Sequence, residues 1–446
     1  MDRERDGLSR REFMRGAAVT GVTMAGLSLA NAAYAQGNDE IRVGLVGCGG
    51  RGIGAAANAM DADPGVRLTA LADLFQERVD DAQSHLKERR PDQVTADADH
   101  CFVGLDAYKD VIEACDVVLI ANAAKFHPMQ MTAAIEAGKH VFVEKPHAID
   151  PAGIQQAARA LDLAKENGLG VLSGLHSRFQ SNIRETMQRV QDGQIGDIVS
   201  IEENYLRSPY FGRNFRDRPE DLREIELQYG TQYRFAWLCG DDVTQSLVHN
   251  LDRATWGLGE IAPVRCHGLG GRSGEPVFGD VFDHHAVVYH YENGARVYAF
   301  CRTTENCYEE HNTSVIMGTK GTAYVMHGNI TGENPWQFDG QSPDPFLQEH
   351  REFFESIREG SPLHCGDYMT RSTLMTIMGQ LSCYSGQEIT WEEAEQSEYV
   401  LPPAPEDCTW DMEPPTEPDA DGVYPVPATP GVTENGWPAA YGAGQR

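Results

Sequence analysis

The stretch IRVGLVGCGGRGIGAAANAM, residues 41–60, decides the fold class of this 446-residue chain. An apolar strand runs into the glycine motif GCGGRG, and a helix of small residues follows. The spacing G-x-G-x-x-G between a strand and a helix predicts a dinucleotide-binding turn. Gly47 permits the turn, Gly49 lets the backbone approach a pyrophosphate, and Gly52 lets helix and strand pack closely. The helix N-terminus adds amides and a positive dipole. The predicted phosphate-binding residues are Gly47, Gly49, Gly50, Arg51 and Gly52.

A second predicted strand, VRLTALAD, ends in Asp73, about twenty residues after the last glycine of the motif. A carboxylate at this place accepts hydrogen bonds from both hydroxyls of the adenosine ribose and repels a 2′-phosphate. The sequence therefore favours NAD over NADP as the cofactor.

Apolar strands and helices continue to alternate as far as GLGVLSGLH, which predicts a doubly wound parallel sheet and a nucleotide-binding domain over residues 36–175. The strand at 141–146 ends in VFVEKP. Glu144 and Lys145 thus stand at the carboxyl end of a parallel strand, where such sheets bind ligands. A surface ion pair is the alternative interpretation.

From residue 176 to about 400 the pattern changes to β-rich runs separated by the turn signals ENG (292–294) and TKG (319–321), which favours an antiparallel arrangement. Two helices, 346–360 and 368–386, are expected to pack back near the first domain. Within this region GDDVTQSLVHNLD, residues 240–252, predicts one amphipathic helix. Its polar side chains within an arc of roughly 80° are Asp242, Gln245, His249 and Asp252.

Four motifs together, GxGGRG, AGKHVFVEKPHAID, GDxVxQxxHNxD and GTKGTAYV, resemble the glucose–fructose oxidoreductase/inositol dehydrogenase family (Gfo/Idh/MocA) over nearly the whole chain after its N-terminal segment. The resemblance implies an α/β protein with an N-terminal Rossmann domain. It also implies a C-terminal α+β domain whose open, mainly antiparallel sheet binds substrate and often forms the subunit interface. A homo-oligomer, dimer or tetramer, is therefore expected.

By the same resemblance, Glu144 would contact the nicotinamide ribose, and Lys145 would lie beside the nicotinamide and the reacting carbinol. His249 would accept the proton of the substrate hydroxyl. Many relatives carry Asp four residues before this histidine, but here the position is Gln245, which cannot titrate. Lys145 and His249 then become the expected acid/base pair, and Asp242 could supply the missing carboxylate.

The family motif T-P-x-x-x-H is kept here only in part, because Asn122-Ala123 replaces Thr-Pro. Asn122 and His127 are expected cofactor contacts, with a packed loop residue as the alternative for His127. Planar donors and aromatic platforms suit a sugar, although they also fill interfaces. The predicted substrate contacts are Arg178, Tyr205, Arg207, Tyr233, Trp237 and Asp252.

No metal site is expected, since His284, His285 and His290 do not form a compact set with acidic residues and no cysteine spacing suggests zinc. The net charge of −30 disfavours contact with nucleic acid or an anionic membrane surface.

The N-terminal segment 1–35 contains SRREFMRG, with Arg10 and Arg11 as a pair, then a short apolar run ending at Ala35. This pattern resembles a cleaved twin-arginine signal, which predicts a periplasmic or secreted protein. Residues 401–446 are rich in proline and acidic residues. They are expected to be either disordered or an extended arm lying on their own or a neighbouring subunit.

Three functions remain open at this stage. The first is an exported NAD-dependent oxidoreductase for a sugar, polyol or glycoside, with a tightly held cofactor that is recycled in place. The second, which relatives in the family suggest, is a glycosidase that works by transient oxidation, elimination, addition of water and return of hydride. The third is a sugar-binding protein without catalysis.

Overall fold

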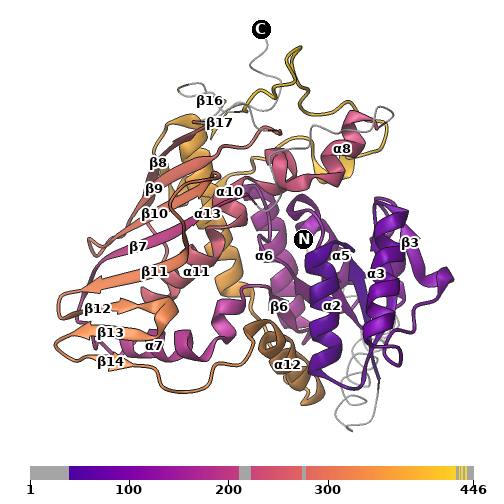
Figure 1. Ribbon diagram of the computed structural model, residues 1–446, viewed down its shortest axis with the longest axis horizontal. Coiled ribbons are helices and arrows are strands. Elements are labelled where there is room, and N and C mark those ends of the chain that lie inside the picture. Colours follow the sequence, from indigo (N-terminus) through magenta and orange to yellow (C-terminus); the bar gives the residue numbers. More distant parts are fainter. Residues whose placement is uncertain are drawn as a thin grey trace, which may run out of the picture.

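The computed structural model describes residues 40–209, 222–273 and 278–427, with isolated positions between 431 and 438. The predicted signal segment, 1–35, and the last part of the arm lie outside these residues. Figure 1 shows a wide sheet on the left, a smaller sheet wrapped by helices on the right, and helices between them. In the described part no helix is long and apolar enough to cross a membrane.

The first sheet is parallel throughout and has the strand order β3-β2-β1-β4-β5-β6. Successive strands are added on one side of β1 as far as β3 and on its other side from β4 onward. A crevice therefore opens at the carboxyl ends of β1 and β4. This arrangement confirms the predicted Rossmann domain. Its strands are Ile41–Val46 (β1), Val66–Asp73 (β2), Cys101–Val103 (β3), Val117–Ile120 (β4), His140–Val143 (β5) and Val171–Ser173 (β6).

Helices cover both faces of this sheet and close two apolar cores. One core holds the small side chains of Gly50–Ala62 (α2) and the apolar face of Gln76–Arg89 (α3). The opposite core is closed by Tyr108–Glu113 (α4), His127–Glu136 (α5) and Pro151–Glu166 (α6).

The second sheet has nine strands in the order β14-β13-β12-β11-β7-β10-β9-β8-β15. Its neighbours pair antiparallel except for β7 and β10, which run parallel. The expected open, mainly antiparallel sheet is confirmed. The strands are Ile198–Arg207 (β7), Arg265–Gly271 (β8), His284–His290 (β9), Arg296–Thr303 (β10), Glu310–Gly318 (β11), Gly321–Tyr324 (β12), Asn329–Gly332 (β13), Trp336–Gln337 (β14) and Ile389–Thr390 (β15).

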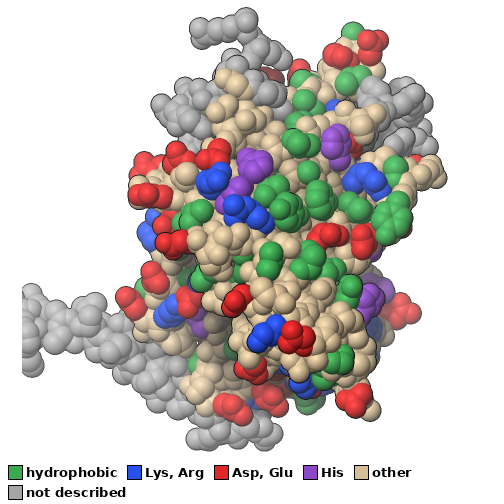
Figure 2. All heavy atoms as spheres, turned by 90° about the vertical axis from the view of Figure 1, so that its left-hand side faces the viewer, with side chains coloured by type: hydrophobic (Ala, Val, Ile, Leu, Met, Phe, Trp, Pro, Cys, Tyr) green, Lys and Arg blue, Asp and Glu red, His purple; other side chains and the backbone are tan. Residues whose placement is uncertain are grey.

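The two faces of the second sheet differ in what covers them. The inner face packs on Ser181–Gln191 (α7), Val248–Gly257 (α11) and Gly366–Ser385 (α13). On the outer face, Figure 2 shows hydrophobic side chains gathered across the middle, with histidines and basic residues among them. Exposed apolar residues here include Leu269, Tyr298, Phe300 and Tyr324.

The helix Pro345–Arg358 (α12) returns to the first domain, as expected, and packs on α2. Phe353 and Phe354 complete the apolar core on that face of the Rossmann sheet. Arg358 Nη2 donates to Asp63 Oδ1 over 2.9 Å at the end of α2. The helix therefore joins the two domains beside the glycine loop.

The prediction of a single helix over 240–252 is wrong. The segment forms two helices, Asp242–Gln245 (α10) and α11, with a break at Ser246 and Leu247. Nearly every side chain of this segment is buried, so it has no solvated face. Asp241 begins α10 with φ 87° and ψ 172°, an extended conformation with positive φ that is uncommon outside glycine. Its buried carboxylate accepts hydrogen bonds from Tyr384 and from the backbone N–H of Phe282.

Candidate active site

The glycine loop between β1 and α2 has the geometry that a bound pyrophosphate needs. Gly47 adopts φ 99°, and a Cβ at Gly52 would lie 1.8 Å from the carbonyl oxygen of Gly47. In contrast, a Cβ at Gly49 or Gly50 would meet no atom within 4 Å. Gly47 and Gly52 have no room for a side chain. Gly49 and Gly50, in contrast, leave open space above the N-terminus of α2. The loop therefore fits a dinucleotide.

Asp73 closes the end of β2 beside this loop. Its Oδ2 accepts the backbone N–H of Cys48 at 2.8 Å, and its Oδ1 accepts that of Phe75 at 3.2 Å. The Arg78 guanidinium lies 3.9 Å from the carboxylate. Because both oxygens accept backbone amides, the carboxylate is fixed in position beside the glycine loop.

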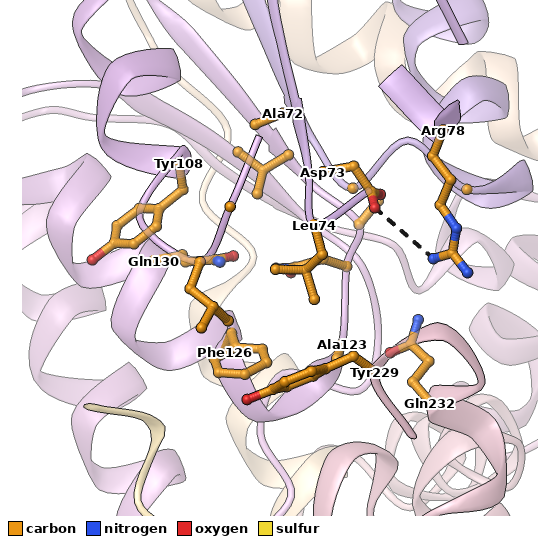
Figure 3. A pocket seen from close by; sticks show the side chains of 17 residues that line it. Ala72, Asp73, Leu74, Arg78, Tyr108, Ala123, Phe126, Gln130, Tyr229 and Gln232 are labelled. Carbon is orange, nitrogen blue, oxygen red and sulfur yellow. Dashed lines mark ion pairs between the residues drawn. The ribbon is translucent and has the colours of Figure 1, made fainter. Parts of the chain in front are cut away.

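A pocket with apolar walls opens beside Asp73 (Figure 3). Leu74, Tyr108 and Phe126 line it on the side of the first domain, which suits a flat heterocycle. Tyr229 and Gln232, from the second domain, also line it, and Figure 3 shows Tyr229 beside Phe126. Sequence reasoning missed these residues, because only the fold brings 229–232 to the Rossmann crevice.

A second, wider cavity adjoins the first, and Asn122 and Gln232 line both. The predicted residues Lys145 and His249 meet here with the glycine loop. The side chains that line this cavity are Arg51, Asn122, Glu144, Lys145, His176, Tyr205, Gln232, Tyr233, Gln245, Ser246, His249, Asn312 and Phe346.

Lys145 projects into this cavity from the end of β5. Its ammonium donates to the main-chain oxygen of Gln245 at 2.7 Å. Burial lowers the pKa of Lys145 to about 8, although the neighbouring charge of Glu144 opposes the change. An amine with this pKa can exchange a proton near neutral pH.

Glu144 is held by the glycine loop, because the Arg51 guanidinium forms an ion pair with its carboxylate. The same guanidinium lies 3.4 Å from Glu349 of α12 and 4.9 Å from the ring centre of Phe346. Arg51 thus connects the loop, the strand end that carries Lys145, and α12. Glu349 gave no sequence signal, since it looks like one more acidic position on an amphipathic helix.

His249 is 7% exposed and lies at the start of α11. Burial, and secondarily the charge of Lys145, keeps the pKa of His249 well below its usual range, so the ring is a neutral proton acceptor. Within the described residues its Nδ1 has no hydrogen-bond partner. The ring of His176 packs edge-on at 4.9 Å and itself stacks on Phe346 at 4.2 Å. His176 was missed, although it follows the last strand of the parallel sheet.

Gln245 and Asp242 are both close to the cavity, but neither orients His249 through a hydrogen bond. The amide of Gln245 donates to the main-chain oxygen of Cys239 at 3.1 Å. Asp242 pairs with Arg207 at 3.0 Å and accepts the hydroxyl of Ser246 at 2.8 Å. Asp242 therefore contacts Arg207 and Ser246 and not His249, and its role as the replacement carboxylate stays a prediction.

The two residues of the partly kept T-P-x-x-x-H motif have different roles. His127 is buried, with Nδ1 2.7 Å from the main-chain oxygen of Pro146 and Nε2 3.2 Å from that of Asn122. His127 joins two loops and lines neither cavity. It therefore matches the alternative of a packed loop residue better than that of a residue in contact with the cofactor. Asn122 lines both cavities, and its buried Oδ1 has no protein partner among the described residues.

The predicted substrate contacts fall into two groups. Tyr205 and Tyr233 line the wide cavity, and Arg207 lines a smaller adjoining one. Arg178, Asp252 and Trp237 do not reach these cavities, which corrects the prediction. Arg178 and Asp252 form a buried ion pair at 2.7 Å, and the buried Trp237 ring donates to Gln228 at 2.8 Å. Among the described residues no group of three His, Cys, Asp or Glu is arranged to hold a metal ion.

A parallel sheet with an open glycine loop, facing a separate sheet domain across a cavity with a lysine and a histidine, defines a two-domain oxidoreductase with a Rossmann fold. The family model "Oxidoreductase family, NAD-binding Rossmann fold" matches residues 41–175, and "GFO/IDH/MocA C-terminal domain" matches residues 183–324. The chain belongs to the Gfo/Idh/MocA family.

Individual relatives are distant. "Glycosyl hydrolase family 109 protein 1" of Bacteroides fragilis is 30% identical over 186 residues, which cover 40% of this chain and 38% of that protein. A "Glycosyl hydrolase family 109 protein" of Shewanella baltica is 25% identical over 223 residues, covering 45% of this chain and 46% of the relative. The chain thus matches less than half of the length of either relative.

Two solved structures share the fold. Apo scyllo-inositol dehydrogenase from Lactobacillus casei has a TM-score of 0.61 at 20% identity, covering 79% of this chain and 98% of that one. Levoglucosan dehydrogenase in complex with NADH and levoglucosan has a TM-score of 0.61 at 18% identity, covering 79% and 99%. At these identities the likeness is one of fold.

Proposed function

We propose that this chain oxidises a hydroxyl group of a sugar, polyol or glycoside. The observation that carries the proposal is the convergence of Lys145 and His249 on one cavity with the open glycine loop. Bound NAD would supply the hydride acceptor, and the loop residues Gly49 and Gly50 with Asp73 and Asn122 would hold it. The names of the structural neighbours, which include inositol and levoglucosan dehydrogenases, support a carbohydrate as substrate.

His249 and Lys145 take successive parts in the transfer of the hydroxyl proton. His249 is neutral, so its ring nitrogen accepts the hydroxyl proton of a substrate in the cavity. Lys145, whose pKa is lowered to about 8, binds the same oxygen and passes the proton onward. Tyr205 and Tyr233 supply the flat surfaces against which a sugar ring packs.

We also propose NAD, not NADP, as the cofactor. The carboxylate of Asp73 is positioned by two amides to bind the ribose hydroxyls. Arg78, the nearby cation that a 2′-phosphate would need, donates to the main-chain oxygen of Gly230 at 2.7 Å and lies over the Phe75 ring. A comparison of the dissociation constants of the two nucleotides tests this choice.

The second candidate is a glycosidase that oxidises, eliminates, adds water and returns the hydride. The names of the curated relatives favour it. The cavity lining does not suit ordinary hydrolysis, because among the described residues its single carboxylate is Glu144, which Arg51 already holds. Hydrolysis by the common pathway needs two carboxylates flanking the bond.

One experiment separates these candidates. The purified protein is analysed for bound nicotinamide nucleotide, then offered free sugars and aryl glycosides in parallel. Stable accumulation of NADH identifies a dehydrogenase, whereas release of the aryl group without net NADH identifies the glycosidase. A protein that neither contains nor binds the nucleotide would refute both and leave the non-catalytic binding protein.

Export by the twin-arginine route, and a periplasmic or secreted location, are further proposals. They rest on Arg10 and Arg11 in SRREFM. This route carries folded proteins, so a nucleotide bound in the cytoplasm could be exported with the chain. Replacement of both arginines by lysine should keep the protein in the cytoplasmic fraction of a host that has this pathway.

A further inference from the structure

The helix Glu224–Gly230 (α8) and the turn after it cross the adenosine side of the nucleotide crevice. Tyr229 and Gln232 are the second-domain residues that line this pocket in the described part of the chain. Arg78 fastens the end of α8 to the first domain through the main-chain oxygen of Gly230 at 2.7 Å. The helix is therefore an outer wall of the pocket, as Figure 3 shows for Tyr229 and Gln232.

The C-terminal arm, residues 401–427, holds α8 from its other side. Its main-chain oxygens accept three hydrogen bonds from the α8 region, at Trp410 from Arg223 (3.0 Å), at Thr416 from Gln228 (2.7 Å) and at Thr409 from Tyr229 (3.3 Å). The hydroxyl of Tyr424 donates to Glu224 at 2.8 Å. Of the two alternatives for this segment, its described part is an arm that lies on its own chain.

Trp410 is the point where the arm, α8 and the Rossmann domain meet. Its ring centre lies 5.3 Å from that of Tyr229 and 5.7 Å from that of Phe75, two residues after Asp73. Both contacts are edge-to-face, a favourable geometry for aromatic pairs. Movement of α8 away from the pocket would break both contacts.

The arm is also anchored where it begins. The ammonium of Lys125 donates to the main-chain oxygen of Leu401 at 2.7 Å, and Asp150 accepts the N–H of Leu401 at 3.0 Å. Lys125 is 2% exposed, and its ammonium lies 5.9 Å from the ring centre of Trp237. The arm thus starts at buried polar contacts with the first domain, and its residues 409–416 then lie against α8.

We propose that this arm is a strap that closes α8 over the adenosine half of the site and retains the dinucleotide through successive turnovers. Tyr229 and Gln232 form the outer wall of the adenosine site, and Trp410 holds that wall in place. The nucleotide cannot leave unless α8 lifts, and α8 cannot lift until the strap contacts break. The inference rests on the proposed use of NAD, and it explains how a cofactor would be recycled in place.

The test measures nucleotide release directly and does not depend on turnover. Full-length protein is loaded with NADH and diluted into excess NAD, and the loss of bound NADH fluorescence gives the release rate. Trp410→Ala should release NADH about tenfold faster, because two aromatic contacts are lost. Trp410→Phe should release NADH at a rate close to that of the wild type, because an aromatic ring is kept. Tyr424→Phe, which removes one hydrogen bond, should accelerate release about threefold. Glu413→Ala, an exposed position of the same arm, is the matched control and should match the wild type.

Melting temperatures of the variants show whether each remains folded, and Tyr424→Phe keeps the test valid should Trp410→Ala unfold. The strap is refuted when Tyr424→Phe and a folded Trp410→Ala release NADH at the wild-type rate. If the wild-type chain binds no NADH at all, the proposed function fails and the strap fails with it. Binding that is tight in the wild type and equally tight in the variants refutes only the strap.

Discussion

At the scale of single residues, His249, the proposed proton acceptor, lacks the carboxylate that was expected four residues before it. Position 245 is glutamine, and its amide is used to hold the main-chain oxygen of Cys239. His249 instead packs against the neutral ring of His176. Burial keeps the imidazole of His249 neutral, and the neighbouring charge that lowers its pKa most is that of Lys145, whose own pKa is lowered to about 8.

This arrangement predicts the pH dependence of the oxidation step. Below its pKa of about 8, Lys145 is an ammonium without a lone pair and cannot take up the proton that His249 accepts from the hydroxyl and pass it onward. His249 is neutral both below and above pH 8, so its titration adds no further change to the dependence of the rate on pH. The rate of oxidation should therefore rise with pH and level off above about pH 8, and single-turnover rates across the range measure it. A rate that is flat from about pH 6 to 9 would contradict the role given to Lys145.

At the scale of elements, the glycine loop and the broken helix at 240–257 place the reacting groups. The loop leaves space for phosphates at Gly49 because nothing in the protein fills it. Asp241 starts α10 with a positive φ, at a cost of about 1–3 kcal/mol that its buried hydrogen bonds offset. The break after α10 turns the main-chain oxygen of Gln245 toward Lys145.

The loop predicts opposite outcomes for two substitutions three residues apart. Gly52→Ala would place a Cβ 1.8 Å from the oxygen of Gly47, so the melting temperature should fall sharply. Gly49→Ala meets no protein atom and has an ordinary φ of −75°, so the fold should be unaffected. Its methyl group would enter the phosphate space and weaken NAD binding by about 1–3 kcal/mol. Calorimetry of unfolding and of NAD binding measures both, and equal NAD affinity of Gly49→Ala and wild type would contradict the assigned cradle.

Much of the fold could be predicted from local sequence, and much of the site could not. The glycine spacing, the strand–helix alternation and the turn signals are patterns within about twenty residues, so they predicted the Rossmann sheet and the antiparallel sheet. The parallel pairing of β7 with β10, the break between α10 and α11, and the pairing of Arg178 with Asp252 depend on contacts between distant segments. Motif resemblance supplied Lys145 and His249, whereas His176, Tyr229 and Trp410 become visible only in three dimensions.

At the scale of the whole molecule, the described residues leave the middle of the outer face of the second sheet uncovered (Figure 2). Leu269 is 66% exposed there, and Tyr298, Phe300 and Tyr324 lie on the same sheet. Apolar patches on soluble proteins commonly mark protein–protein contacts. We propose that this face joins subunits into a homo-oligomer, as the family resemblance implies.

Charged substitutions on this face test the proposal. Leu269→Asp and Phe300→Asp should each shift the mass measured by light scattering toward that of one chain, because a buried unpaired carboxylate disfavours association. Val103→Asp, an exposed apolar position on β3 of the other domain, is the matched control. A wild-type protein that is already monomeric, or a face variant with unchanged mass, would contradict the proposed interface.

In the proposed function, hydride passes from a carbohydrate carbon to NAD in the cavity that holds Lys145 and His249. The most direct measurement mixes nucleotide-loaded protein with a glycoside or sugar that it turns over, and follows the absorbance of reduced nicotinamide in the first turnover. This absorbance should appear no later than product, should rise more slowly when the reacting carbon carries deuterium, and should not rise in His249→Ala with its nucleotide still bound. Product formed with no reduced nicotinamide at any time, and with no effect of deuterium, would contradict it.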